Sequence, residues 1–418
     1  MKIEYARAAS TTECDDYSAV VARAFAWDPE MARGWVRDWG HDCVRVLRVD
    51  GTLVGGLQLI PLGVYFGGRS VGLTGVGAVV LLPEHRGKGA GKVLMREAML
   101  EAMSSDRPLA GLFPATLPVY RSAGFEQAGA RVETALTLNQ IRPRRECVAA
   151  WNDKDLRLEA IANSEEIRAR APDAHSVHAS IRDLYARVAP AFDGHLDRPA
   201  NVWRTQVYAL KREPTHGYAI RRLSTGRVEG YFFYHQTRGD SGIELLVRDA
   251  VCETPAAWAR FLGFLADHWS TSDRAVWMVP AQHPALSMLS EDYFKSSHAV
   301  SWMLRVMNVR RALEDRGFAP SLRTSFALRV SDDLFPENQG TWRVAIEAGR
   351  ARVSRGDDAE PAVALDVRTL APIFSGWQTP RALRAAGLVA CADDAMLDNV
   401  AAAFANAHGS TPWLSEIY

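Results

Sequence analysis

The sequence predicts a mixed α+β protein with two related domains followed by a third, smaller α+β unit. Three observations carry this prediction. The chain has 418 residues, more than one hydrophobic core normally organises. The strand–helix–strand order of residues 70–113 recurs in residues 242–280. The pattern then changes in residues 326–407, where a strand meander precedes short helical segments.

The first domain alternates strand and helix signals. Residues 44–66 contain two apolar strands around an Asp-Gly turn, which is typical of a hairpin. Residues 70–82 form a further strand, whose internal glycines suggest a bulge or a close backbone approach. Residues 91–103 have apolar side chains at helical spacing, and 109–113 read as a short strand.

The end of this domain is predicted with less regular elements. Residues 119–129 read as a helical turn closed by Gly124, and 130–138 as a final alternating strand. Residues 141–150 are basic and contain a proline, so we expect a linker there.

The second domain begins after this linker. Residues 181–189 predict a helix, and 217–237 predict a hairpin around a Thr-Gly turn. A strand over 242–251, an amphipathic helix over 255–269 and a strand over 274–280 repeat the order seen in the first domain.

The third unit is predicted as a meander. A strand over 326–332 and a turn over 336–340 precede a second strand over 341–356. Three helical segments follow, at 368–374, 380–387 and 395–407.

Composition excludes several classes of protein. Hydrophobic residues make up 48% and charged residues 23%, as in ordinary globular proteins. The 49 Lys and Arg balance 49 Asp and Glu, so no basic excess supports a nucleic-acid partner. The apolar stretches are too short to span a membrane, and acids replace the apolar core of a leader peptide, so we expect a cytoplasmic protein.

No metal site is expected either. The five cysteines contain no Cys-x-x-Cys pair, which also argues against a disulfide framework. His175 and His178 lie three residues apart but have no carboxylate nearby to complete a ligand set. His-Glu-x-x-His and Gly-x-Ser-x-Gly are absent from the sequence, which removes the common zinc-peptidase and hydrolase readings.

The most informative segment is a glycine-rich turn between a strand and a helix, residues 81–92. Backbone N–H groups at such a turn can hold a pyrophosphate. The segment lacks the upstream glycine that a P-loop requires, and Lys92 occupies the position of the third glycine of a dinucleotide-binding fingerprint. The pattern that fits is Arg/Gln-x-x-Gly-x-Gly/Ala, from Arg86 to Gly91. A glycine-rich turn without a ligand is the alternative.

This pattern resembles the acetyl-CoA loop of the GNAT acyltransferases. Tyr120, Gly124 and Phe125 match that family's Tyr-x-x-x-Gly-Phe segment. The resemblance implies that strand backbone binds the pantetheine arm, that loop amides bind the pyrophosphate, and that Tyr120 protonates the departing thiolate. A core or capping tyrosine is the alternative for Tyr120.

The whole chain is similar to the Eis family of multi-acetylating N-acetyltransferases. The matching segments include Gly194–Pro199, Pro336–Trp342 and Pro412–Tyr418. The resemblance implies two tandem GNAT domains and a sterol-carrier-like domain, assembled as a hexamer. The domain boundaries that we expect are 1–145, 146–304 and 305–418.

The resemblance also implies site residues. The free carboxylate of Tyr418 would be the general base, in a position where Phe is commoner in the family. The expected acetyl-CoA contacts are Val79, Val80, Leu81, Arg86, Gly87, Lys88, Gly89, Ala90, Gly91, Lys92, Ala115 and Thr116.

The second domain lacks an equivalent glycine cradle. Residues 248–255 follow its corresponding strand, and Asp249 and Glu253 would repel a pyrophosphate. We therefore expect one acetyl-CoA per chain and a structural role for this domain. Lipid binding by the third domain is a weaker alternative to its role in supplying the C-terminus.

The predicted activity is transfer of acetyl from acetyl-CoA to amines of polyamino compounds, including aminoglycosides, with protein lysine as a further acceptor. Trp35 and Trp39, in an acidic segment of residues 26–42, either contact such a cation or pack in the core. The alternatives are an acetyltransferase for one small amine or for protein lysine, and a non-catalytic scaffold with a vestigial loop.

Overall fold

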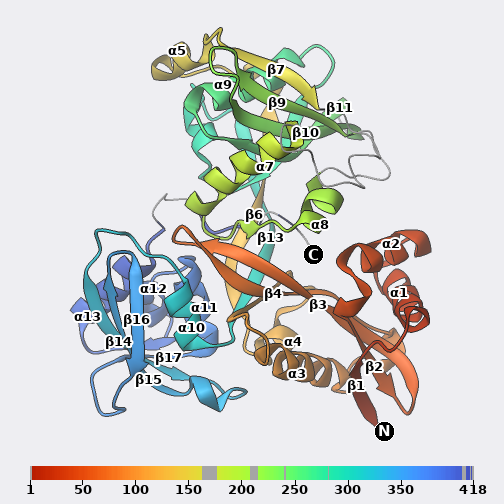
Figure 1. Cartoon of the computed structure of the whole chain (residues 1–418), viewed down its shortest axis with the longest axis vertical. Helices are drawn as coiled ribbons and strands as arrows, with labels where there is room; N and C mark the ends of the chain where they lie inside the picture. The colour runs from red at the N-terminus through yellow and green to blue at the C-terminus, as the bar shows by residue number, and fades with distance from the viewer. Residues whose placement is uncertain are drawn as a thin grey trace. The chain divides into compact units, whose positions relative to one another are not determined.

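The structure is a computed structural model. It describes residues 2–161, 177–207, 215–239, 242–280, 282–406, 411–414 and 416, which form two compact units. The first unit comprises Met1–Gly129, Ser301–Ala407 and Glu416–Tyr418; the second comprises Ala130–Val300 and His408–Ser415. Figure 1 labels their elements.

The first unit contains a sheet with the strand order β1-β2-β3-β4-β5-β13. The strands are β1 (Ile3–Arg7), β2 (Val44–Val49), β3 (Thr52–Phe66), β4 (Arg69–Leu81), β5 (Leu109–Leu112) and β13 (Phe294–Val306). The predicted hairpin of residues 44–66 and the strands over 70–82 and 109–113 are thereby confirmed.

Helices cover both faces of this sheet. On one face, α3 (Ala90–Met103) and α4 (Leu117–Arg121) pack against side chains such as Leu47 and Leu57. On the other, α1 (Thr11–Phe25) and α2 (Pro29–Trp39) pack against Val44, Val46 and Val80. In Figure 1, α3 and α4 lie together beside β3 and β4. The predicted helix over 91–103 is confirmed as α3.

No bounds were predicted from the sequence for α1 or α2, although both helices carry N-terminal signals. Ser10 accepts a hydrogen bond from the Glu13 amide at 3.2 Å, as helix-capping serines do. Asp28 precedes Pro29 and accepts from the amides of Glu30 and Met31. These short cap patterns mark the starts of both helices.

Two predictions near the end of the first domain are wrong in their bounds. The helical turn predicted over 119–129 is closed by Gly124 as expected, with a left-handed φ of +85°, but α4 already ends at Arg121 and the chain enters β6 (Glu126–Thr137) soon after the glycine. The linker predicted over 141–150 contains two helical turns, η4 (Arg145–Cys147) and α5 (Val148–Trp151).

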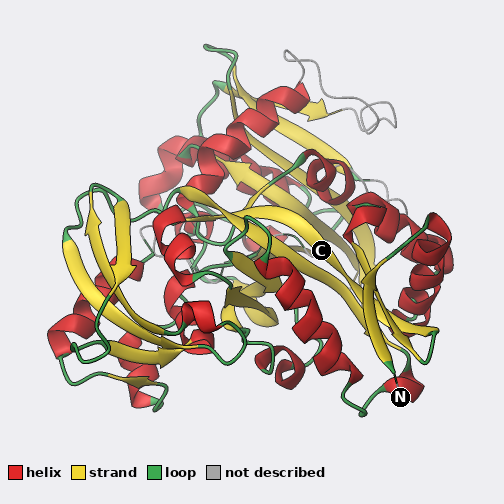
Figure 2. Cartoon of the chain, turned by 60° about the horizontal axis from the view of Figure 1, so that its bottom comes forward, coloured by secondary structure: helices red, strands yellow, loops and turns green. Residues whose placement is uncertain are grey.

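The remainder of the first unit is a smaller sheet with the order β16-β15-β14-β17-β18. Its strands are β14 (Thr324–Ser331), β15 (Gly340–Glu347), β16 (Arg350–Arg355), β17 (Val363–Asp366) and β18 (Val389–Ala390). The accompanying helices are α10 (Val309–Asp315), α11 (Val367–Ser375), α12 (Pro380–Ala385) and α13 (Asp394–Phe404). Figure 2 distinguishes these helices and strands by colour.

The single strand predicted over 341–356 is wrong. It is a hairpin of β15 and β16, which turns at Ala348 and Gly349 with φ angles of +51° and +76°. Two consecutive left-handed residues are typical of a tight hairpin turn. The three helical segments predicted after it are confirmed as α11, α12 and α13.

The second unit contains a sheet with the order β6-β12-β11-β10-β9-β7. These strands include β7 (Leu156–Ile161), β9 (His216–Arg222), β10 (Val228–Gly239), β11 (Gly242–Cys252) and β12 (Arg274–Val279). The helices α7 (Val177–Val188) and α9 (Pro255–Asp267) match two predicted helices, and α9 packs in a core with Phe232, Leu245 and Trp277. Among the described residues, no helix is both long and apolar enough to cross a membrane.

Candidate active site

The candidate site begins where β4 leaves β5. The two strands pair in parallel at Leu73–Leu109, Thr74–Ala110 and Gly75–Gly111, whereas β4 continues to Leu81. The Leu82 amide donates to Val54 of β3 at 2.9 Å, so the backbone groups of the preceding Leu81 face away from β3. The end of β4 therefore offers strand backbone that β5 does not use.

A β-bulge sits at this departure. Gly56 of β3 faces Val80, and Gln58 faces Gly77, so Ala78 and Val79 together oppose one residue. Ala78 has a left-handed φ of +46°, and its carbonyl accepts a 2.6 Å hydrogen bond from the buried Tyr17 hydroxyl. Of the two interpretations that the sequence left open for this strand, a bulge or a close backbone approach, the structure has the bulge, at Ala78 and Val79 next to Gly77. The sequence did not single out Tyr17 or Ala78, because the contact joins residues far apart in the chain.

The glycine-rich loop follows the short turn η2 (Pro83–His85) and opens α3. Gly87 and Gly89 have φ angles of +75° and +84°, and Gly89 caps the helix without a side-chain hydrogen bond. Within the described chain, the backbone amides of residues 87–91 donate to no protein acceptor. A cluster of unused amides at a helix N-terminus is suited to an anion such as a pyrophosphate.

The basic side chains of the loop stabilise its shape. Arg86 Nε donates to the Leu81 carbonyl at 3.0 Å, and Lys88 Nζ donates to the Glu84 carbonyl at 3.0 Å. Both side chains belong to exposed residues, so their charges stay next to solvent and to the loop amides. Lys92, also exposed, lies in the first turn of α3, where its amide donates back to Gly89.

Gly91 brings three elements of the site together. A Cβ atom added to Gly91 would lie 3.4 Å from Leu81 Cδ1 and 4.0 Å from Val119 Cγ1. The end of β4, the start of α3 and the turn α4 therefore meet at this glycine. Val79 and Leu81 pack half-buried on the α3 side, whereas Val80 is buried on the α1 side.

Tyr120 lies on α4, next to this meeting point, and is 5% exposed. Burial raises the pKa of its hydroxyl to about 12, while a hydrogen bond from the Ala115 backbone opposes that rise. Ala115 and Thr116 are exposed and precede α4 directly. The structure thus places Tyr120, the predicted general acid, on the same face of the first domain as the loop. Its hydroxyl is protonated at neutral pH.

Tyr418 lies outside the described residues. The tail before it is anchored in the second unit: Trp413 Nε1 donates to His195 Nε2 at 2.6 Å, and Leu414 is fully buried. Gly194 adopts a φ of +92°, and a Cβ atom there would lie 2.6 Å from the Trp413 carbonyl oxygen. Gly194 and His195 are therefore in contact with Trp413 of the tail. These residues belong to two of the segments that resemble the Eis family.

The second domain repeats the strand geometry but not the cradle. In β11, residues 244–247 pair with β12 and the strand continues to Cys252, with a register shift at Phe233/Tyr234 of β10. The helix α9 then begins at Pro255, which has no amide hydrogen. The cap residue Thr254 accepts from Ala257 and donates to Glu229 at 2.8 Å.

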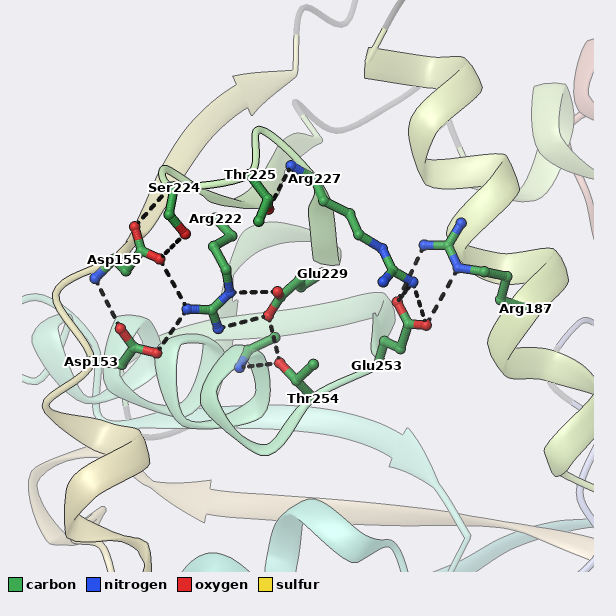
Figure 3. A network of polar contacts seen from close by, with 11 residues as sticks. Asp153, Asp155, Arg187, Arg222, Ser224, Thr225, Arg227, Glu229, Glu253 and Thr254 are labelled. Atoms are coloured by element: carbon green, nitrogen blue, oxygen red, sulfur yellow. Dashed lines mark hydrogen bonds and ion pairs between the residues drawn. The ribbon is translucent and has the colours of Figure 1, made fainter.

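Carboxylates occupy this corner of the second domain, as Figure 3 shows. Glu229 pairs with Arg222, and Glu253 pairs with both Arg187 and Arg227, the closest distances being 2.5, 3.2 and 2.7 Å. The arginines are already committed to these carboxylates. The corner therefore offers a pyrophosphate little net positive charge.

Three tryptophans at and just before α2 contact one another through their rings. The ring centroids of Trp27 and Trp35 are 5.6 Å apart, and those of Trp35 and Trp39 are 6.1 Å apart. Trp39 is 5% exposed, so it packs in the core, whereas Trp27 and Trp35 are half-buried. In the described part of the chain, no group of three or more His, Cys, Asp or Glu side chains could hold a metal ion.

Comparisons with known proteins agree with this architecture. Residues 5–128 and 194–306 match models of the GNAT acetyltransferase domain, and residues 309–415 match the sterol carrier protein domain. The predicted fold class of two GNAT domains and a sterol-carrier-like domain is therefore confirmed. The exact boundaries stay a prediction.

Individual relatives point the same way. The N-acetyltransferase Eis of Mycobacterium tuberculosis is 26% identical over 344 residues, which cover 79% of this chain and 78% of Eis. A GCN5-related N-acetyltransferase from Anabaena variabilis superposes with a TM-score of 0.88 at 27% identity, over the whole of both chains. Eis1 from Mycobacterium abscessus shares the fold over both whole chains, with a TM-score of 0.78 and 19% identity.

Proposed function

We propose that this chain, which carries two GNAT acetyltransferase domains and is similar to Eis, acetylates amines of polyamino compounds such as aminoglycosides. The observation that carries the proposal is the coincidence, on one face of the first domain, of three features. These are the strand backbone freed where β4 leaves β5, the unused amides of residues 87–91, and the buried hydroxyl of Tyr120.

GNAT domains imply the use of acetyl-CoA, and the residues present fit it. When bound, acetyl-CoA supplies an acetyl thioester. We propose that the backbone from Val79 to Leu81 holds its extended arm and that residues 86–92, with Ala115 and Thr116, hold its phosphates and the adjoining chain. Unused amides at the start of a 14-residue helix support the phosphate assignment.

Tyr120 is proposed as the general acid. Its raised pKa means that the hydroxyl carries its proton at neutral pH. A thiol titrates near 8.5 in water, so proton transfer from a group near 12 is uphill by about 5 kcal/mol if the thiolate keeps its solution pKa. Burial of a thiolate raises its pKa as well, which narrows the gap in a closed site.

The carboxylate of Tyr418 is proposed as the general base, which takes a proton from the substrate ammonium so that the amine can attack. The Trp413–His195 hydrogen bond supports this role in that it fixes a described residue five positions before Tyr418. A main-chain carboxylate titrates near 3.5 when exposed, so desolvation would have to raise its pKa for this task.

A cationic acceptor is supported by the half-buried Trp27 and Trp35, because aromatic faces attract ammonium groups. Asp28 and Glu30 adjoin them at the start of α2. We further propose that the protein is a cytoplasmic homohexamer without nucleic-acid, membrane or metal partners.

The test is mass spectrometry of an amine panel after incubation with acetyl-CoA. The panel contains kanamycin as an aminoglycoside, spermidine as a linear polyamine, a lysine-containing peptide and tyramine as a monoamine. Multiple acetylation of kanamycin supports the proposal. Exclusive modification of the peptide or of one small amine would indicate a dedicated enzyme, and coenzyme binding without any product would indicate a scaffold.

A further inference from the structure

A buried ion pair joins the third domain to the turn that carries Tyr120. Arg305, on β13, and Asp332, just after β14, each have side chains that are 1% exposed, and Arg305 Nη2 lies 2.9 and 3.0 Å from the two carboxylate oxygens. Asp332 lies within residues 309–415, the segment that matches the sterol carrier domain. Arg305 itself pairs with Ala110 of β5, so the ion pair connects the sterol-carrier segment to the sheet of the first domain, within the first unit.

Arg305 uses its other terminal nitrogen on the tyrosine turn. Its Nη1 donates to the Ala123 carbonyl at 2.6 Å, while the Ala123 amide donates to the Tyr120 carbonyl at 2.9 Å. The peptide groups around Ala123 thus connect the guanidinium to Tyr120. A helix as short as α4, with five residues, has little stability of its own, so such an external contact fixes its position.

Gly124 fits against the same guanidinium. It has a φ of +85°, and a Cβ atom added there would lie 1.2 Å from Arg305 Nη1. The glycine of the Tyr-x-x-x-Gly-Phe segment is therefore needed both for the backbone conformation and for the approach of Arg305.

The carboxylate partner is itself held in place. Asp332 accepts from the amides of Leu334 and Phe335 at 3.0 and 3.1 Å, and from Asn338 Nδ2 at 2.9 Å. The Phe335 ring lies under the guanidinium, 4.5 Å from ring centroid to Cζ. A buried ion pair with this many hydrogen bonds has one favoured geometry, and removal of either partner leaves a buried charge unpaired.

We propose that Arg305 and Asp332 are positioning residues for Tyr120, through which the third domain sets the placement of the general acid. This inference rests on the proposed function, because it requires Tyr120 to act in the reaction. It gives the sterol-carrier-like domain a task in catalysis that requires no lipid.

The experiment measures kcat and the acetyl-CoA dissociation constant with kanamycin as acceptor, for Arg305→Lys and Asp332→Asn. A lysine retains the charge but cannot reach Asp332 and Ala123 with two separate nitrogens. We expect kcat to fall by about 10-fold to 100-fold, the loss that a displacement of about 1 Å produces, while acetyl-CoA affinity stays within about twofold. Gly124→Ala disturbs the same contact from the turn and should change kcat in the same direction; if one of the two buried variants does not fold, the other carries the measurement.

The matched control is Arg316→Lys. Arg316 is also 1% exposed and lies in the same unit, where it donates to the Phe374 carbonyl and contacts the Phe374 and Phe404 rings. The hydrogen bond and ring contacts seen for it in the described part of the chain are with Phe66, Phe318, Phe374 and Phe404, outside the tyrosine turn of residues 117–124. We expect the control to lower the melting temperature and to leave kcat unchanged, so an equal loss of kcat in both variants would mean that instability alone is responsible.

The deciding measurement places Arg305→Lys in a Tyr120→Phe background. If Arg305 acts through Tyr120, adding Arg305→Lys to the Tyr120→Phe enzyme changes kcat by less than about twofold. The same fold-loss in both backgrounds, or an unchanged kcat for Arg305→Lys alone, overturns the positioning role but leaves the proposed acid intact. An unchanged kcat for Tyr120→Phe alone overturns the proposed acid, and the positioning role with it.

Discussion

At the scale of single residues, Tyr120 owes its environment to segments that are distant in the sequence. Its burial comes from a core that also contains Met303 and Phe335, which lie far along the chain. The raised pKa follows from that burial, and no local pattern reports it. The same is true of Arg305, whose contact with Gly124 joins residues from different domains.

The first prediction concerns Tyr120. Replacement by Phe keeps the ring and removes the proton donor, so we expect kcat to fall by about 100-fold or more, as general-acid loss usually causes. Acetyl-CoA affinity should stay nearly constant, because the loop amides are untouched. Because the Tyr120 pKa is raised to about 12, the wild-type rate should show no alkaline decline due to this residue below about pH 10. A Tyr120→Phe enzyme with normal turnover would contradict the assignment.

The second prediction concerns pH and stability of the second unit. Burial lowers the pKa of His195 and His283 to about 3. Both histidines therefore have a lower pKa in the folded state than in the unfolded state, where it is near 6.5. The free energy of unfolding keeps its full value above about pH 6.5 and decreases as the pH falls toward 3. At pH 5, each histidine lowers the free energy of unfolding by about 2 kcal/mol relative to neutral pH.

We therefore expect the melting temperature to fall between pH 7.5 and pH 5. His283→Asn should flatten this dependence, because the amide oxygen can replace Nδ1 as acceptor for the Ala285 amide without binding a proton. His216→Asn, at an exposed residue, should leave the dependence as it is. Identical pH slopes for wild type and His283→Asn would show that this histidine is not linked to folding.

At the scale of elements, strong periodicity and turn residues predicted most of the strands and the helix α3. The misses have physical causes. The hairpin of β15 and β16 was read as one strand because its turn, Ala348-Gly349, contains only one glycine. The splay between β4 and β5 is a difference in pairing along two strands, so it depends on tertiary structure and not on local sequence.

The third prediction tests the loop. Gly89→Glu introduces a negative charge beside the unused amides, at a φ of +84° where a side chain has open space but a strained backbone. We expect acetyl-CoA binding to be lost while the melting temperature changes little, as measured by calorimetry. Gly51→Glu is the matched control, since Gly51 also has a φ of +84° and open space, on the β2–β3 turn. Equal acetyl-CoA affinity in the two variants would refute the loop assignment.

The fourth prediction concerns the second domain. Where the first domain has its glycine-rich loop, the second domain has Glu229, Glu253 and a helix, α9, that begins with a proline. Because the described residues of this region offer no comparable set of amides to a pyrophosphate, titration should saturate at one acetyl-CoA per chain. Gly89→Glu should then abolish all detectable binding. A residual site of similar affinity in that variant would show that the second domain also binds the coenzyme.

At the scale of the whole molecule, the order of three domains could be predicted from repeated element order and from the family resemblance. The grouping of the third domain with the first could not, because it depends on contacts between distant segments. Phe66, in β3, lies 5.1 Å from Phe374 by ring centroids, and the Gly317 amide donates to the Phe66 carbonyl at 3.0 Å. Together with the Arg305–Asp332 pair, these contacts make the third domain part of the same compact unit as the first.

The last prediction concerns the tail, whose base would be a main-chain carboxylate. If the carboxylate of Tyr418 is the base, its side chain matters little, so Tyr418→Phe should keep most of its activity. Extension by three glycines after Tyr418 moves the carboxylate while the Trp413–His195 anchor can still form. We expect this variant to bind acetyl-CoA normally and to lose turnover by about 100-fold, the scale of general-base loss. A tail that only packs would tolerate the glycines, so equal turnover of the native-ended and extended chains would exclude the terminal carboxylate as the base.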